Sequence, residues 1–259
     1  MEKENTFDLS SFRKIWKSDV LESDIAEISG FLNDSPLLRE ALNVRNSSLA
    51  IIDLKRMVYI SCIGESKPVC GWDTEVLLKG GVGFFLSNLK PADFDGLQVM
   101  SSIMTDHVSG LSTERLKTFK ALFDFQMVGE DGSINRVVQE GVSLKRNSDG
   151  HIVFLLALIS NITSMKRENR QHLRLTDQLE DLIFEVNNET GKCRRLENLS
   201  RRELQIARLI GKQLTSEEIA KSLFISVHTV NTHRQNMLKK LDMGDTMELL
   251  NFLTAYHLI

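Results

Sequence analysis

The last sixty residues of the chain contain three pairs of residues that mark the starts of helices. In each pair a Ser, Thr or Asp is followed three positions later by Glu: Ser200 with Glu203, Thr215 with Glu218, and Asp245 with Glu248. In such a capping box each side chain accepts a hydrogen bond from the backbone N–H of the other residue. Ser226 predicts a fourth start, and Gly211 predicts the end of the first helix. Four short helices with tight connections can bury their apolar faces only in a compact bundle.

The helix predicted from Val227 to Leu241 has two different faces. At about 100° per residue, Val230, Met237 and Leu241 point in nearly one direction, which predicts the core side. The opposite side has no carboxylate and consists of His228, Asn231, Thr232, Gln235 and Lys239. Asn and Gln can form two hydrogen bonds with adenine, Thr can contact a thymine methyl group, and Lys can neutralise a phosphate. With the short helix and the tight turn before it, this helix predicts a helix-turn-helix unit that reads DNA. A solvated amphipathic face is the alternative, but such faces usually mix Glu and Lys four residues apart.

The charge distribution restricts where nucleic acid could bind. The 259-residue chain has a net charge of -3. Residues 199–259 contain eight Lys and Arg against six Asp and Glu, whereas the rest of the chain contains 24 against 29. A uniformly basic surface is therefore excluded, and a DNA site has to be local to the C-terminal region.

Four motifs in this region occur as LSRRE, EIAKSLFIS, TVNTH and LKKL. With them, the segment from Leu199 to about Leu253 closely resembles the LuxR-type helix-turn-helix family. The resemblance implies that residues 199–259 form a DNA-binding domain and that the helix after Ser226 reads double-stranded DNA. It also implies that the final helix pairs two subunits.

Carried over by position, the resemblance implies base contacts for Asn231, Thr232 and Gln235. It implies contacts with the phosphate backbone or the groove edge for Ser226, Val227, Thr229, Arg234, Lys239 and Lys240. Many family members have Lys where this chain has Asn231, so the preferred DNA sequence cannot be taken from them. Arg234 lies close to the core side of the helix and has a second interpretation, an ion pair with Glu217 or Glu218 inside the bundle.

Residues 48–166 have the pattern of an antiparallel sheet with helices on one face. The runs SLAIIDL and MVYIS predict a hairpin, and a helix is predicted from about Pro91 to Val108. Three further strands are predicted at 119–128, 134–144 and 151–162. Asp-Gly pairs at 131–132 and 149–150 predict the hairpin turns, because Gly adopts positive φ without a Cβ clash.

This element order, with YIS, GW, LKPADF, GEDGS and a closing NIT, resembles a PAS domain. The resemblance implies signal sensing, partner binding or dimerisation, with a helix that leaves the last strand and transmits the state. Residues 1–47 have apolar residues at helical spacing in DIAEISGFL and SPLLREAL, which predicts two or three short helices.

Residues 167–198 are predicted to be a helical connector and a linker. Leu175, Leu179, Leu182 and Val186 are spaced by four, three and four residues, which is typical of a coiled-coil seam. A helix packed on its own sheet explains this spacing equally well. The stretch NNETGK then predicts the linker.

Other chemistries lack their defining residues. GGVG at 80–83 is not a complete phosphate-binding motif and predicts a turn. Asp53 lacks the acidic pair and the Lys of a phosphorylated receiver domain, and His107 and His151 lack a partner at ligand spacing. Cys62, Cys70 and Cys193 lack zinc or redox spacing. The sequence therefore predicts no enzyme, no metal site and no evident cofactor, and it leaves the ligand of the PAS-like domain unknown.

The sequence predicts an α+β protein: a PAS-like antiparallel sheet domain with flanking helices, followed by an all-α four-helix domain. Its predicted function is a signal- or partner-responsive transcription regulator that binds double-stranded DNA as a homodimer, so that two half-sites lie about one helical turn apart. The alternative is a scaffold in which the PAS-like domain only dimerises and binds another protein. The N-terminus lacks an apolar signal core, and the longest apolar run, Ile152–Ile159, is far shorter than a membrane span. A cytoplasmic protein without a membrane anchor is expected.

Overall fold

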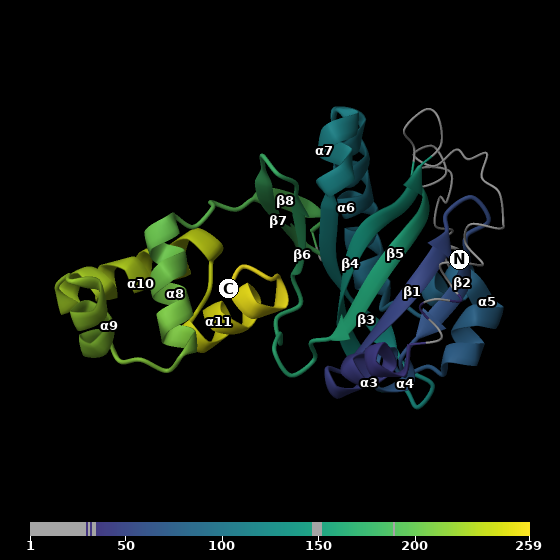
Figure 1. The fold of residues 1–259 in the computed structure, drawn as a ribbon, viewed down its shortest axis with the longest axis horizontal. Helices are drawn as coiled ribbons and strands as arrows, with labels where there is room; N and C mark the ends of the chain where they lie inside the picture. The colour runs from purple at the N-terminus through teal and green to yellow at the C-terminus, as the bar shows by residue number, and fades with distance from the viewer. Residues whose placement is uncertain (1–29, 31, 33–34, 147–151, 189) are drawn as a thin grey trace.

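The computed structural model describes residues 30, 32, 35–146, 152–188 and 190–259. Its β-strands form one antiparallel sheet in the order β2-β1-β5-β4-β3-β6-β7-β8, and the four C-terminal helices form a bundle at one side of it (Figure 1). The strands are β1 (Ser47–Asp53), β2 (Val58–Ile63), β3 (Lys120–Val128), β4 (Ile134–Arg146), β5 (Ile152–Asn161), β6 (Gln171–Thr176), β7 (Asp181–Asn187) and β8 (Lys192–Arg195). The expected α+β class with a PAS-like sheet domain and an all-α domain is confirmed.

Five helices lie before the bundle in the described part of the chain. They are α3 (Pro36–Val44), α4 (Lys67–Cys70), α5 (Thr74–Ser87), α6 (Pro91–Ser109) and α7 (Thr113–Thr118). The helix predicted from about Pro91 to Val108 is α6, and α3 contains the segment SPLLREAL except Ser35, which is its N-cap. The segment DIAEISGFL falls almost entirely outside the described residues. No helix among the described residues is both long enough and apolar enough to span a membrane.

The two faces of the sheet have different partners. Because side chains alternate along a strand, Ala121, Phe123 and Phe125 of β3 point to one face and join the core formed with α5 and α6. Leu122 points to the other face and belongs to an apolar cluster shared with the C-terminal bundle. We call the first face the inner face and the second the outer face.

Glycine sets the backbone at two of the predicted turns. Gly132 has a φ of 80° in the turn between β3 and β4, as the Asp-Gly pair predicts. Gly81 has a φ of 64° and kinks α5, so the GGVG segment lies within a broken helix rather than a simple turn. The second Asp-Gly pair, at 149–150, lies outside the described residues.

Residues 171–187 form a β-hairpin, and both helical interpretations of the connector at 167–198 are wrong. β6 pairs with the edge of β3 on one side and with β7 on the other. Leu175 lies directly opposite Leu182, and both are in the inner-face core. Leu179 lies in the turn with 72% of its surface exposed. The spacing of apolar residues arises because the hairpin returns the chain to the same face of the sheet.

The turn of this hairpin is specified locally. The backbone N–H groups of Leu179 and Glu180 donate to Oδ1 of Asp177 at 2.7 and 3.0 Å. Asp therefore closes the turn through its own side chain, as it does in many tight turns. The result is that three strands, β6 to β8, extend the sheet where a transmitting helix was expected.

The C-terminal bundle contains the four predicted helices. They are α8 (Arg201–Gly211), α9 (Ser216–Leu223), α10 (Val227–Leu241) and α11 (Thr246–Ala255). Both hydrogen bonds of the capping box are present at the starts of α8 and α9. At α11 the Asp245 side chain accepts the expected bonds, but the Glu248 carboxylate accepts from the N–H of Gly244.

α8 ends at Gly211, as predicted. The residue with left-handed backbone is Gln213, with a φ of 64°. Glycine is therefore not the residue that reverses the chain here.

Candidate nucleic-acid interface

The connection between α9 and α10 is short because both of its ends are capped. Phe224 ends α9 in a left-handed conformation with a φ of 54°, and the N–H of Ile225 donates to the carbonyl of Ala220 at 3.0 Å. Ser226 then begins α10, and its Oγ accepts a bond from the N–H of Thr229 at 3.0 Å. This short reversal fixes the direction in which α10 leaves α9.

Three fully buried side chains fix the rotation of α10 about its axis. Val230, Met237 and Leu241 each have 0% of their surface exposed and lie in the core of the bundle. The opposite face is exposed at all five predicted positions: His228, Asn231, Thr232, Gln235 and Lys239. The structure thus brings the predicted polar residues together on one open helix face that has no acid.

The predicted residues at the start of α10 lie beside this face. Ser226 and Val227 are exposed and Thr229 is half-buried, with the hydroxyls of Ser226 and Thr229 2.8 Å apart. A hydroxyl here can donate to a phosphate oxygen of DNA, as can the free N–H groups of the first helical turn. The first turn of α10 contains no acidic residue that would repel a phosphate.

Arg234 lies inside the bundle, as its position near the core side of α10 suggested. Its guanidinium donates to the hydroxyls of Ser216 at 3.2 Å and Thr246 at 3.1 Å, and so connects α9, α10 and α11. The expected ion pair with Glu217 or Glu218 does not form. Both carboxylates are exposed, and two neutral hydroxyls are closer to the guanidinium.

Lys240 also has an internal partner. Its Nζ lies 2.8 Å from Oε2 of Glu203, a side chain with 4% of its surface exposed. Burial favours a raised pKa for Glu203, but the bonds from Lys240 and Ser200 outweigh it and the pKa of this carboxyl is lowered. The charge of Lys240 therefore compensates a buried carboxylate between α8 and α10.

Two residues at this surface were not found from the sequence. Ser216 donates from its hydroxyl to Oδ1 of Asn231 at 2.9 Å, which leaves the amide NH₂ group of Asn231 to face outward. Phe224 is 95% exposed at the tip of the turn. The only sequence signal for Ser216 is its place at the start of α9.

The sheet domain contains a second candidate site, an apolar cavity of about 120 Å³ between the inner face and α5 and α6. Its walls are mainly Leu, Ile, Met, Phe and Val side chains. The polar groups among the lining residues come from Tyr59, Ser101, Gln139 and Ser143. The hydroxyl of Ser101 is buried and has no hydrogen-bond partner among the described residues.

One cluster of potential metal ligands, His107 with Asp177 and Glu180, is already neutralised. The guanidinium of Arg115 lies 2.7 Å from Asp177 and also pairs with Glu180. The cation of Arg115 therefore already neutralises both carboxylates of the cluster.

The fold and the open face of α10 define a helix-turn-helix domain of the DNA-reading type. Residues 197–253 match the model of the family described as bacterial regulatory proteins, luxR family. The C-terminal domain is therefore a LuxR-type helix-turn-helix domain.

Similar proteins match over part of the chain. One is the transcriptional regulatory protein LiaR of Bacillus subtilis, 41% identical over 63 residues, which covers 24% of this chain and 30% of LiaR. Another is the oxygen regulatory protein NreC of Staphylococcus carnosus, 38% identical over 76 residues, which covers 27% of this chain and 35% of NreC. The chain spans about a third of the length of these curated relatives.

Among solved structures, the crystal structure of the phage VqmA-DPO complex is similar over 91% of this chain and 89% of the other chain. The sequence identity is 15% and the TM-score is 0.28.

Proposed function

We propose that the protein is a sequence-specific DNA-binding transcription regulator in which the PAS-like domain controls the LuxR-type domain. The observation that carries the proposal is the open face of α10, where five polar side chains without an acid lie opposite three fully buried ones. Such a face presents donors and acceptors to base edges and no charge that phosphates repel. The protein acts on DNA in the cytoplasm in this proposal.

The proposed roles follow the geometry of the face. Asn231 and Gln235 are one helical turn apart and read base edges, while Thr232 contacts a thymine methyl group or a phosphate. His228 lies beside them, and Lys239, with Ser226, Val227 and Thr229, contacts the backbone or the groove edge. Arg234 and Lys240 contribute chiefly by holding α10 in the bundle, because their side chains already have internal partners.

Selection of binding sites from random duplex DNA by the full chain tests this proposal. The wild type is expected to enrich a defined sequence, and the double substitution Asn231→Ala with Gln235→Ala is expected to abolish the enrichment. A residual affinity that weakens steeply with salt remains, because the phosphate contacts are intact. Loss of each base contact is worth about 1–3 kcal/mol of discrimination.

Gln205→Ala is the matched control, since Gln205 is an exposed amide on α8, outside the reading face. It is expected to select the same sites as the wild type. If the double variant also selects those sites, the assigned face does not read DNA.

We propose further that the inner-face cavity binds the signal. Apolar cavities of about 150 Å³ bind molecules the size of benzene, and this cavity is of similar size. The unpartnered hydroxyl of Ser101 provides one polar contact among apolar walls. The ligand class is therefore a compact, mainly apolar molecule with one hydrogen-bonding group. An open cavity favours this sensing role over a purely structural PAS-like scaffold, for which a filled interior would be expected.

A further inference from the structure

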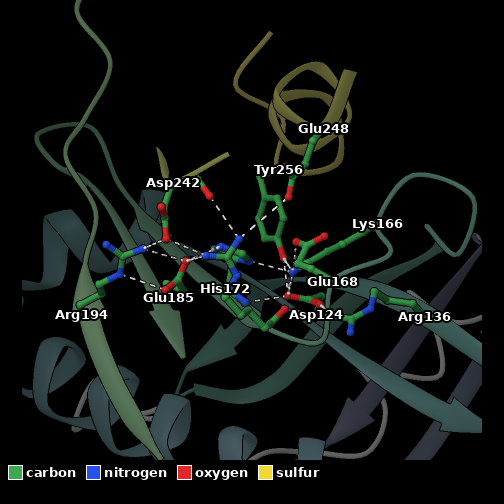
Figure 2. A network of polar contacts seen from close by, with 11 residues as sticks. Asp124, Arg136, Lys166, Glu168, His172, Glu185, Arg194, Asp242, Glu248 and Tyr256 are labelled. Carbon is green, nitrogen blue, oxygen red and sulfur yellow. Dashed lines mark hydrogen bonds and ion pairs between the residues drawn. The ribbon is translucent and has the colours of Figure 1, made fainter. Parts of the chain in front are cut away.

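The helix-turn-helix domain is attached to the outer face of the sheet through a buried polar network (Figure 2). Tyr256, directly after α11, donates its hydroxyl hydrogen to Oδ1 of Asp124 on β3. Nζ of Lys166 lies 2.8 Å from the same oxygen and 3.1 Å from the tyrosine hydroxyl. Arg136 of β4 donates to the other oxygen of Asp124. One carboxylate of the sheet domain thus holds a residue from the end of the DNA-binding domain.

The charges in this network are fixed by their neighbours. Asp124 has 0% of its surface exposed, and burial alone would raise its pKa. The cations of Lys166 and Arg136 outweigh burial, so the pKa of Asp124 lies below its ordinary value. The carboxylate is therefore ionised at neutral pH.

Further contacts surround the network. Arg170 and Arg194 pair with Asp242 at 2.9 and 2.7 Å, and Arg174 donates to the carbonyl oxygens of Tyr256 and His257. An apolar cluster joins Leu122, Val138, Ile162 and Ile183 of the sheet domain with residues of the bundle, including Phe252. We call this whole contact the docking interface.

The docking interface has the composition of a contact that can open. The residues from Leu196 to Ser200, which connect β8 to α8, belong to no helix or strand. Ion pairs with exposed partners, such as Asp242, contribute little to stability. Buried ions recover hydration when an interface opens, which offsets much of the attraction that is lost. Polar interfaces between domains of one chain are commonly mobile for this reason.

His172 of β6 occupies the centre of this interface and has 0% of its surface exposed. Its Nδ1 lies 2.7 Å from Nζ of Lys166. An ammonium group can only donate, so Nδ1 accepts and the hydrogen of a neutral ring is assigned to Nε2. The pKa of His172 lies well below its ordinary value. Burial is the main cause, and the charge of Lys166 is the second. The ring also packs against Phe252 and Tyr256, with centroids 4.9 and 5.7 Å away.

The carboxylates around His172 already pair with cations, so they do not stabilise a second proton on the ring. The titratable and charged neighbours are Asp124 on β3, Arg136 on β4, Lys166, Glu168 and Arg170 on the segment before β6, Glu185 on β7 and Tyr256 after α11. Asp124 already has two cationic partners, and Glu185 pairs with Arg170 and Arg194. Glu185 is also 3.8 Å from Nε2, beyond hydrogen-bond distance.

We infer that protonation of His172 weakens the docking interface, so that the DNA-binding domain detaches from the sheet more readily in mild acid than at neutral pH. A second ring proton would turn Nδ1 into a donor that faces an ammonium group. Detachment removes Phe252 and Tyr256 from the ring and exposes it to water, where it accepts the proton more readily even with Lys166 still beside it on the sheet domain. The inference depends neither on a ligand in the cavity nor on the proposed base contacts.

The direction and size of the effect follow from linkage. Burial is the main cause that lowers the pKa of His172 in the docked state, and detachment relieves it, so the pKa rises toward its ordinary value of about 6.5. The docked state is therefore favoured above pH 6.5 and loses stability as the pH falls below it. Between pH 7.5 and pH 5.5 the ratio of detached to docked molecules rises by up to about tenfold.

A second histidine, His257, lies at the edge of the interface. Nδ1 of His257 lies 3.3 Å from Glu140, and this contact is the main cause that lowers the pKa of Glu140 to about 2. His257 is half exposed, so solvent screens its pair with Glu140 and the pair contributes little to the interface.

Detachment changes the position of the DNA-binding domain and not the exposure of its reading face. The five polar residues of α10 are exposed in the docked state. What docking fixes is the direction of α10 relative to the sheet, which matters for any pair of half-sites at a defined spacing.

Thiol labelling of the full chain measures this equilibrium. Ile183→Cys places a thiol at a position that is 3% exposed within the docking interface, and the exposed Cys193 serves as an internal reference for thiol reactivity at each pH. Labelling with a pyridyl disulfide, followed by peptide mass spectrometry, gives the rate at position 183 relative to position 193. This relative rate is expected to rise several-fold, up to about tenfold, from pH 7.5 to pH 5.5.

Two substitutions in the same background separate the histidines. His172→Gln keeps an acceptor for Lys166 but cannot be protonated, and it is expected to abolish the rise. His257→Gln removes only an exposed contact and is expected to preserve the rise.

An equal relative rate at the two pH values, no labelling at position 183 at either pH, or a full rise in His172→Gln would each overturn the inference. If His172→Gln does not fold, histidine NMR of the wild type decides. A ring at position 172 that titrates near pH 6.5 while position 183 stays protected would overturn it.

Discussion

At the scale of single residues, Ser101 is the polar group whose role is tested most directly. Its hydroxyl lies in the wall of the inner-face cavity without a partner, and a buried hydroxyl in this state costs about 1–3 kcal/mol. Ser101→Ala is therefore expected to raise the free energy of unfolding of the ligand-free protein by about 1 kcal/mol. The same substitution is expected to weaken ligand binding about fivefold, since a hydrogen bond of about 1 kcal/mol is lost.

Chemical unfolding of the ligand-free protein measures the first effect, and titration with phenol as a probe of the proposed ligand class measures the second. Ser102→Ala is the control, because Ser102 is the next residue of α6 and is exposed. A Ser101→Ala protein that is less stable than the wild type, or that binds phenol equally well, would show that the hydroxyl does not face a ligand.

At the scale of elements, the hairpin of β6 and β7 predicts unequal effects on stability for substitutions of two leucines, whereas a helix in this region does not. Leu175 has 0% of its surface exposed in the inner-face core, and Leu179 is 72% exposed in the turn. Leu175→Ala is expected to lower the free energy of unfolding by about 2–5 kcal/mol. Leu179→Ala is expected to change it by less than about 0.5 kcal/mol. Urea unfolding followed by circular dichroism gives both values.

A coiled-coil seam would place both leucines in the same contact, and the two substitutions would then cost similar amounts. Equal losses of stability would therefore favour the helical interpretation over the hairpin.

The elements that were predicted from the sequence are those whose signals are local. Ser200 and Thr215 mark helix starts through bonds within four residues, and the Asp-Gly pair that includes Gly132 marks a turn in the same way. The exposed face of α10 followed from helical geometry alone. The contacts that α10 makes with other helices do not follow from helical geometry, so the partners of Arg234 and Lys240 were not predicted.

The elements that were missed depend on contacts between distant parts of the chain. β6 is a strand because the edge of β3, about fifty residues earlier, offers it backbone hydrogen bonds. The apolar spacing of residues 175–186 fits a helix as well as a hairpin, and only the sheet edge decides between them. For the same reason no local pattern indicates the contact between Asp124 and Tyr256, which meet across 132 residues.

At the scale of the whole molecule, the sheet lies between the two candidate sites. On β3, Ala121 and Phe123 line the cavity while Leu122 and Asp124 face the DNA-binding domain. β4 has the same arrangement: Gln139 and Gly141 line the cavity, and the two residues that alternate with them, 138 and 140, contact the bundle or His257. A displacement of these two strands at the cavity would therefore also move the neighbouring side chains that contact the DNA-binding domain.

The final helix provides the last prediction, which concerns the proposed homodimer. In the docked state α11 still presents a partly open side, with Met247 66% exposed and Leu250, Asn251 and Thr254 at helical spacing from it. If two copies pair through this side, Met247→Glu places like charges in the contact and is expected to raise the dimer dissociation constant at least tenfold. Sedimentation equilibrium and native mass spectrometry measure this constant.

Leu37→Glu is the matched control for pairing through the bundle, because Leu37 is also an exposed apolar residue, at 80%, but lies on α3 of the sheet domain. It is expected to leave the dissociation constant unchanged. If Leu37→Glu separates the subunits and Met247→Glu does not, the two copies pair through the sheet domain. The reading helices are then positioned by the docking interface rather than by α11, and the spacing of the half-sites should change when that interface opens. A monomer at micromolar concentration in the wild type, with and without DNA, would rule out both modes of pairing.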